Sequence, residues 1–209
     1  NEIDPEKVKI EIIKTSGDKF LNTSLSKIGG KGLFTKEIQQ ALIDNRIDIA
    51  VHSMKDVETE LPEKLVISTI LKREDVRDSF ISRRYSSIAD LPLGSVVGTS
   101  SLRRKAQLLN KRKDLKVVEF RGNVQKRLEK LDNNVAVATF LATAGLNRLG
   151  LVELINPIST DEMLPAVAQG AVGIEHLRSE KMEEFLAPLN DSVSKKRVEA
   201  ERAFLRELD

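Results

Sequence analysis

Short segments in which apolar and polar residues alternate follow one another along the chain, separated by segments with the spacing of amphipathic helices. From Val8 to Ile13 apolar and charged residues alternate, as in a half-buried strand. From Phe34 to Leu42 the apolar residues recur every three or four positions, which indicates a helix, and the apolar segment from Ile47 to Val51 indicates another strand. The beginning of the chain is therefore predicted to form a strand, a helix and a strand.

The same change of spacing continues to the end of the chain. Strands are predicted at residues 65–71, 80–82, 95–97, 116–120, 135–140 and 171–175, and helices at residues 101–109, 124–131, 180–186 and 192–208. Strands that alternate with helices are typical of an α/β fold.

A length of 209 residues suits two α/β domains of modest size. No repeat or low-complexity linker marks a boundary, so we place the crossings at the charged segment Lys72–Asp75 and after Pro165. Two crossings make the first domain discontinuous. We expect it at residues 1–72 and 168–190, with the second domain at 73–167.

The composition narrows the classes of function. The 34 basic and 32 acidic residues nearly cancel, and only 4% of residues are aromatic, which disfavours nucleic acid and anionic membranes as partners. With no cysteine and two distant histidines, His52 and His176, the usual zinc and iron–sulfur sites have no ligand set, so we expect no metal. No apolar run approaches the length of a membrane span.

Polar and ionisable residues follow the predicted strand that ends at Val51. Ligands bind at the carboxyl ends of strands in open α/β sheets, and the Asp56 carboxylate there is suited to transferring a proton or holding a cation. The alternative is structural: Asp56 caps the next turn, Lys55 is solvated and His52 is a core residue with its hydrogen bonds satisfied.

The segment from Gly98 to Arg104 follows a strand and opens a helix. Small residues, free backbone N–H groups and the positive end of the helix favour an anion there, and two adjacent arginines add to this. The alternative is an ordinary cap by Ser100 or Ser101 with arginines on the surface. A nucleotide P-loop is excluded, since Gly30 and Lys31 are followed by glycine.

Arginines recur at two further junctions between a strand and a helix, at Arg121 with Arg127 and at Arg148. Each alone is an ordinary surface charge. Together they indicate a face that binds carboxylates, because the planar guanidinium matches a carboxylate bidentately. A polycarboxylate ligand is therefore predicted.

Two glycine-containing segments complete the candidates. The loop from Gly29 to Phe34 is suited to closing over a ligand, or is a glycine turn with Phe34 in the core. The segment from Pro165 to Ala171 is a candidate hinge, in which Gln169 donates either to a ligand or to the backbone.

Six segments stand in a fixed order along the chain: GGKGLFTKE, AVHSMKD, GTSSLRR, RGNVQKR, ATAGLNRLG and PAVAQGAVGIE. Together they resemble the successive signatures of hydroxymethylbilane synthases, also called porphobilinogen deaminases. They extend from Gly29 to Glu175, and weaker similarity continues over residues 200–203.

The resemblance implies a three-domain enzyme whose first two α/β domains are similar to type II periplasmic binding proteins, with the active site in the cleft between them. Residues 191–209 would begin a third, α+β domain that is mostly absent from this chain. The implied reaction is a transferase step of tetrapyrrole and heme biosynthesis. Four porphobilinogen molecules are deaminated and joined head to tail on a dipyrromethane primer, which releases hydroxymethylbilane and ammonia.

The resemblance also implies roles for particular residues. Asp56 would be the catalytic carboxylate that promotes loss of ammonia. The residues implied to bind the cofactor are Ser53, Lys55, Thr99, Ser101, Arg103, Arg104, Arg121 and Gln169, those implied to bind the substrate are Arg121, Arg127 and Arg148, and Lys31 and Phe34 would belong to a mobile loop.

The sequence departs from the family pattern in three ways. The family begins with an arginine-containing strand before the point where this chain starts, and its cofactor is held through a thioether to a cysteine that this sequence lacks. Glu58 replaces a common proline, for which we expect a local effect on the loop. We expect the fragment to be inactive without that cysteine.

The competing hypothesis is a non-catalytic two-domain protein that clamps a small polycarboxylate. Asp56 distinguishes the two, because a clamp for anions has no need of a carboxylate among its arginines. As an enzyme, the protein is expected to be a cytoplasmic monomer that acts on the small molecule porphobilinogen, without a nucleic-acid or membrane partner.

Overall fold

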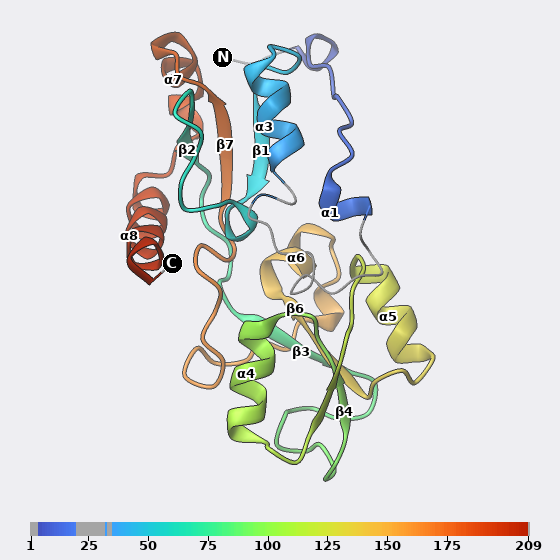
Figure 1. Cartoon of the computed structure of the whole chain (residues 1–209). Helices are drawn as coiled ribbons and strands as arrows, with labels where there is room; N and C mark the ends of the chain where they lie inside the picture. The colour runs from blue at the N-terminus through green and yellow to red at the C-terminus, as the bar shows by residue number, and fades with distance from the viewer. Residues whose placement is uncertain (1–3, 20–31, 33–34, 209) are drawn as a thin grey trace.

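The computed structural model describes residues 4–19, 32 and 35–208, and its strands form two separate sheets. Figure 1 shows the first sheet with α3, α7 and α8 in the upper half of the molecule, and the second sheet with α4, α5 and α6 in the lower half. The predicted α/β class is confirmed, since each sheet has its own helices.

The first sheet has three antiparallel strands in the order β1-β7-β2. Its central strand comes from the end of the chain, so this sheet joins residues more than a hundred positions apart. α3 packs against β1 and β7, and α7 and α8 pack against β2. The elements are β1 (Ala50–Ser53), β2 (Leu65–Ile70), β7 (Val172–Leu177), α3 (Lys36–Ile43), α7 (Glu180–Leu186) and α8 (Ser192–Leu208).

The second sheet has the order β3-β6-β4-β5, in which β5, β4 and β6 are parallel and β3 is antiparallel to β6. Neighbouring residues of β6 enter different cores: Phe140 packs with Leu108 of α4, and Leu141 packs with Leu146 of α6. Because side chains alternate along a strand, α4 covers one face, and α5 and α6 the other. The elements are β3 (Asp78–Ser82), β4 (Val96–Gly98), β5 (Lys116–Val118), β6 (Ala138–Ala142), α4 (Leu102–Lys111), α5 (Val124–Asp132) and α6 (Thr143–Arg148).

Two chain segments cross between the sheets and hydrogen-bond to each other. Leu71 N–H donates to the Val172 carbonyl at 3.0 Å, and Glu74 N–H donates to the Gly170 carbonyl at 3.2 Å. Gly170 has a φ of +86°, and a Cβ there would stand 2.6 Å from the Glu74 carbonyl oxygen, so this close crossing requires glycine. The domain boundaries predicted at residues 72 and 168 stay a prediction, although each lies within this crossing.

The spacing of apolar residues located most elements to within a few positions. The helices predicted at 180–186 and 192–208 are confirmed as α7 and α8. The strand predicted from Val8 to Ile13 is wrong. This segment lies away from both sheets in Figure 1, and the side chains of Ile10 and Ile12 are 84% and 85% exposed. Alternation makes a segment able to pair, but no described strand lies beside this one to accept its backbone hydrogen bonds.

The remaining described elements are short. They are α1 (Ser16–Lys19) and the 3₁₀ turns η1 (Pro5–Lys7), η2 (Met54–Asp56), η3 (Val152–Leu154) and η4 (Ala187–Leu189). No helix in the described part of the chain has the length and apolar character needed to cross a membrane.

Candidate active site

A cavity of about 920 Å³ lies between the two sheets, at the edge where β4, β5 and β6 end. Parallel strands place their carboxyl ends at one edge, and this is where open α/β sheets bind ligands. The size is in the range of small-molecule sites. The predicted cleft is thereby confirmed. Its lining includes Met54–Val57, Thr99–Ser101, Arg103, Arg104, Arg121–Val124, Arg127, Leu141, Leu164–Val167, Gln169, Arg202 and Leu205.

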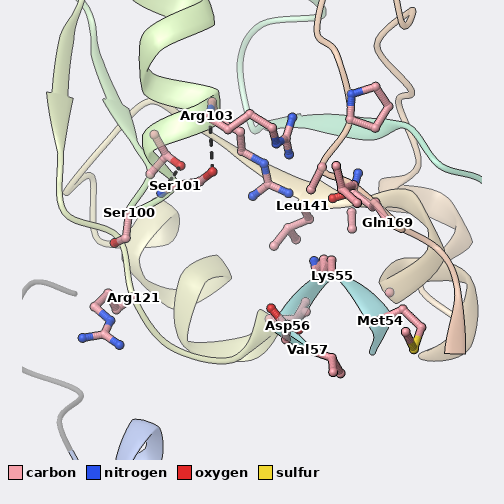
Figure 2. Close-up of a pocket in the computed structure, with 18 of the residues that line it drawn as sticks. Met54, Lys55, Asp56, Val57, Ser100, Ser101, Arg103, Arg121, Leu141 and Gln169 are labelled. Atoms are coloured by element: carbon pink, nitrogen blue, oxygen red, sulfur yellow. Dashed lines mark hydrogen bonds between the residues drawn. The ribbon is translucent and has the colours of Figure 1, made fainter. Parts of the chain in front are cut away.

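Lys55 and Asp56 lie on the turn η2, directly after β1 (Figure 2). The turn is anchored at its first residue, Met54, which is buried and whose N–H donates to the Ala171 carbonyl at 3.0 Å. His52, one position before Ser53, is buried and its Nε2 lies 2.8 Å from Glu175 Oε2. His52 is thus a core residue with a satisfied hydrogen bond, whereas Lys55 and Asp56 remain accessible from the cavity.

The cavity shifts the protonation equilibria of both groups. Partial removal of water raises the pKa of Asp56 above its ordinary value, and the charge of Lys55 and a hydrogen bond with Ser53 offset this only in part. Burial lowers the pKa of Lys55, and the positive charges of Arg104 and Arg103 lower it further. The negative charges of Asp56 and Asp78 raise it, but they do not outweigh these effects. A carboxyl whose pKa lies closer to neutrality is better suited to exchanging protons.

Arg103 and Arg104 line the same cavity from the first turn of α4, and both are already paired with a carboxylate. Arg103 Nη2 lies 2.7 Å from Asp78 Oδ2, and Arg104 Nη2 donates to Asp78 Oδ1 at 2.7 Å. Asp78 is the first residue of β3 and is fully buried. The arginines are therefore neither loose surface charges nor unpaired.

Small polar residues shape the wall between β4 and α4. Ser101 is the N-cap of α4 and its hydroxyl accepts from Arg104 N–H, so this part of the structural alternative is observed. Thr99 is buried and its Oγ1 accepts from Ser101 N–H at 3.2 Å. Ser100 Oγ accepts from Phe120 N–H at 2.9 Å, which ties this loop to the end of β5.

Two more arginines, Arg121 and Arg127, line the cavity in addition to Arg103 and Arg104. Arg127, on α5, donates from Nε to the Gly122 carbonyl at 2.9 Å. Burial lowers the pKa of Arg127, as do the neighbouring charges of Arg104 and Arg121. Cations held this close together repel one another, so an anionic ligand in the cavity would relieve the repulsion.

Gln169 lies in the candidate hinge segment Pro165–Ala171 and bonds to Asp78, the carboxylate that pairs with Arg103 and Arg104. Its Nε2 donates to the Val76 carbonyl at 2.7 Å and to Asp78 Oδ1 at 2.9 Å. Its Oε1 is buried and has no hydrogen-bond partner within the part of the chain that the structure describes. In this structure Gln169 therefore donates to the protein and its oxygen is left as an acceptor, while its contact with a ligand stays a prediction.

The structure gathers nine of the thirteen predicted site residues around the cavity. Ser53 and Arg148 do not line it: Ser53 bonds with Asp56 from the end of β1, and Arg148 Nη2 donates to the Gly170 carbonyl at 2.9 Å. Lys31 and Phe34 lie outside the described residues. The nine are Lys55, Asp56, Thr99, Ser101, Arg103, Arg104, Arg121, Arg127 and Gln169.

Sequence reasoning missed two residues that shape the site, Asp78 behind the cavity wall and Arg202 in the lining. Asp78 had no motif around it, because its partners Arg103 and Arg104 lie more than twenty positions away. Arg202 lies on α8 and donates from Nη1 to the Val57 carbonyl at 2.9 Å and from Nη2 to the Glu58 carbonyl. The weak similarity over residues 200–203 was the one signal available for Arg202.

Comparison with known proteins gives a consistent family. The sequence model of the family described as "Porphobilinogen deaminase, dipyromethane cofactor binding domain" matches residues 1–184. The chain is 57% identical over 203 residues to porphobilinogen deaminase of Paracoccus denitrificans, covering 96% of this chain and 65% of the relative. It is 57% identical over 205 residues to chloroplastic porphobilinogen deaminase of Pisum sativum, covering 97% of this chain and 56% of the relative.

The chain thus spans less than two thirds of the length of these two curated relatives. Among solved structures, lipoprotein Tp32 of Treponema pallidum is similar with a TM-score of 0.51 at 14% identity, covering 78% of this chain and 80% of that one. At this identity the likeness concerns the fold alone.

Proposed function

The chain belongs to the porphobilinogen deaminase family, and from this we propose that it forms the catalytic cleft of a hydroxymethylbilane synthase. The proposed reaction joins four porphobilinogen molecules head to tail on a dipyrromethane primer and releases ammonia at each addition. The whole protein carries this activity, with the described residues providing the cavity.

One observation carries the proposal: Asp56 has a raised pKa and is the one carboxylate among the described residues that line the cavity, where every other charged residue is a cation. A protein that merely clamps anions would bind them more weakly because of this carboxylate. Groups with perturbed pKa values gather at catalytic sites. The position of Asp56 therefore favours catalysis over binding alone.

The residues of the cavity fit a dipyrromethane, a pair of pyrrole rings that bear acetate and propionate groups. Arg103, Arg104, Arg121 and Arg127 offer guanidinium groups for the carboxylates. Leu141 and Val167 provide apolar surface for the rings, and the unpartnered Gln169 oxygen offers an acceptor for a ring N–H. When bound, the dipyrromethane supplies the chain end to which substrate units are added. This sequence has no cysteine, so its residues provide non-covalent contacts.

The chemistry of the substrate explains the need for a carboxylate. Loss of ammonia breaks the bond between carbon and nitrogen in the aminomethyl group of porphobilinogen and leaves positive charge on its pyrrole. An ionised Asp56 stabilises that charge, and the same carboxylate takes up and returns a proton on its Oδ atoms. Lys55, adjacent to Asp56, balances the carboxylate when no substrate charge is present.

Arg121, Arg127 and Arg148 are proposed to bind the substrate carboxylates. Arg121 and Arg127 line the cavity. Arg148 does not line it, and its Nη2 donates to the carbonyl of Gly170, in the segment that crosses between the two sheets. We also propose that the enzyme is a cytoplasmic monomer and that Lys31 and Phe34 belong to a loop that closes over the cavity.

Mass spectrometry and turnover of the full-length protein test this function. We expect a mass excess that matches a dipyrromethane, and consumption of porphobilinogen that Asp56→Asn lowers by about 100-fold or more. Glu60→Gln is the matched control, because Glu60 is an exposed carboxylate four positions further along the chain. An unmodified mass with no turnover, even after preincubation with porphobilinogen, would favour the polycarboxylate-binding protein.

A further inference from the structure

Asp78 is a buried carboxylate that contacts three cavity-lining residues at once. Its Oδ1 accepts from Arg104 Nη2 at 2.7 Å and from Gln169 Nε2 at 2.9 Å, and its Oδ2 lies 2.7 Å from Arg103 Nη2. The carboxylate itself does not line the cavity and has no exposed surface. It therefore stands behind the wall that a ligand would touch.

Asp78 and a backbone carbonyl anchor each guanidinium group, Arg104 through a hydrogen bond to the carboxylate and Arg103 through an ion pair with it. Each uses Nη2 for one oxygen of Asp78 and Nη1 for a backbone carbonyl, Leu164 for Arg103 at 2.6 Å and Phe140 for Arg104 at 2.8 Å. A guanidinium has five N–H donors in a rigid fork. Two contacts on each fork set its plane, and the donors that are neither used nor buried remain for a ligand; these do not include Arg104 Nε, which is buried.

We propose that Asp78 is a positioning residue that holds Arg103, Arg104 and Gln169 in the arrangement that recognises ligand carboxylates. Without this counter-charge, two adjacent guanidinium groups, one of them almost fully buried, repel each other and lose a shared anchor. The inference rests on the function proposed above, and it adds a residue that never touches the ligand.

The charge state of Asp78 agrees with this role. Burial alone would raise its pKa, but the charges and hydrogen bonds of Arg104 and Arg103 outweigh burial and hold the pKa below its ordinary value. Asp78 is therefore ionised at neutral pH, so that it leaves a net charge of +1 over the three groups Asp78, Arg103 and Arg104.

A competing role for Asp78 makes the opposite prediction. If Asp78 occupied the arginines in place of a ligand, its removal would free them and tighten ligand binding. If it positions them, its removal loosens them and weakens binding. The direction of the change in affinity therefore separates the two roles.

The experiment measures porphobilinogen binding by calorimetry in full-length protein carrying Asp56→Asn, in which turnover is blocked. We expect Asp78→Asn in this background to raise the Kd by about tenfold or more. Asp132→Asn is the matched control, since Asp132 also pairs with an arginine, Arg83, but on the surface away from the cavity, and it should leave Kd unchanged.

Asp78→Glu keeps the buried counter-charge, but its longer side chain displaces the arginines. We expect it to weaken binding as well, so the proposal stays testable if Asp78→Asn fails to fold. An unchanged or lower Kd in whichever variant folds would overturn the proposal. Failure of the Asp56→Asn parent to bind porphobilinogen would instead contradict the proposed function.

Discussion

The guanidinium of Arg202 donates to the carbonyl of Val57 at 2.9 Å, one residue beyond Asp56. The same guanidinium also donates to the Glu58 carbonyl, so a single side chain of α8 satisfies two consecutive carbonyls of this turn. Val57 is buried in one core cluster with Val198 of α8. The helix α8 thus fixes the backbone that carries Asp56.

Arg202→Gln should lower kcat of the full-length enzyme by about tenfold and leave KM nearly unchanged. Asp56 would lose its fixed position, while Arg103, Arg104, Arg121 and Arg127 keep theirs. Misplacement of a catalytic group acts mainly on the chemical step. Steady-state kinetics measures the two parameters. Arg202→Lys keeps one donor and should lie between wild type and Arg202→Gln.

Arg197→Gln provides the control for that substitution, because Arg197 is an exposed arginine on the same helix. It should behave as wild type. A loss of thermal stability in Arg202→Gln with kcat unchanged would mean that Arg202 serves the fold only.

Asp56→Asn should stabilise the folded protein at neutral pH although it lowers turnover by about 100-fold or more. The pKa of Asp56 is raised above its ordinary value of 3.8, so the folded state binds more protons than the unfolded state between 3.8 and the raised value. The free energy of unfolding therefore falls as pH rises through this window, and ionised Asp56 costs stability above it. Asparagine removes this cost.

Thermal unfolding of wild type and Asp56→Asn from pH 3 to pH 8 checks the sign. The difference in Tm should be smallest below pH 3.8 and should grow to a plateau at higher pH. A variant that is less stable than wild type at neutral pH would contradict the raised pKa.

Gly98→Ala should destabilise the second sheet by about 1–3 kcal/mol. A Cβ at Gly98 would stand 2.3 Å from the ring of Phe120, which is fully buried. Gly145→Ala is the matched comparison, because a Cβ there meets nothing within 4 Å and alanine favours the helix α6. Urea unfolding should show loss of stability in the first variant and none in the second; equal stabilities would show that the Phe120 ring shifts freely.

Local patterns located the elements of this fold because each helix and strand carries its own periodicity. Ser192–Leu208 was predicted to the residue, since its apolar positions recur at helical spacing and Leu208 ends the pattern. Val8–Ile13 shows the limit of this approach. Its alternation of apolar and charged residues is regular, but a strand also needs a neighbouring strand for its backbone hydrogen bonds. The pattern within one segment does not show whether such a neighbour exists.

The candidate site was predictable as a set of residue types but not as a set of contacts. Arg103 and Arg104 were expected to meet ligand carboxylates, and nothing near them in sequence shows that Asp78 is their partner in the fold. Arg148 was expected beside the same ligand, and nothing near it in sequence shows that its Nη2 donates to the Gly170 carbonyl at 2.9 Å. Ion pairs and backbone contacts between distant positions decide how each arginine is anchored.

The order β1-β7-β2 has a consequence for how the protein is made. A ribosome releases all four strands of the second sheet, which end at Ala142, before it reaches β7 at Val172–Leu177. Until then β1 and β2 are synthesised but lack the strand that joins them. The second sheet is therefore able to mature first on the nascent chain, and the segment that carries Asp56 acquires its final surroundings only after the later part of the chain has emerged.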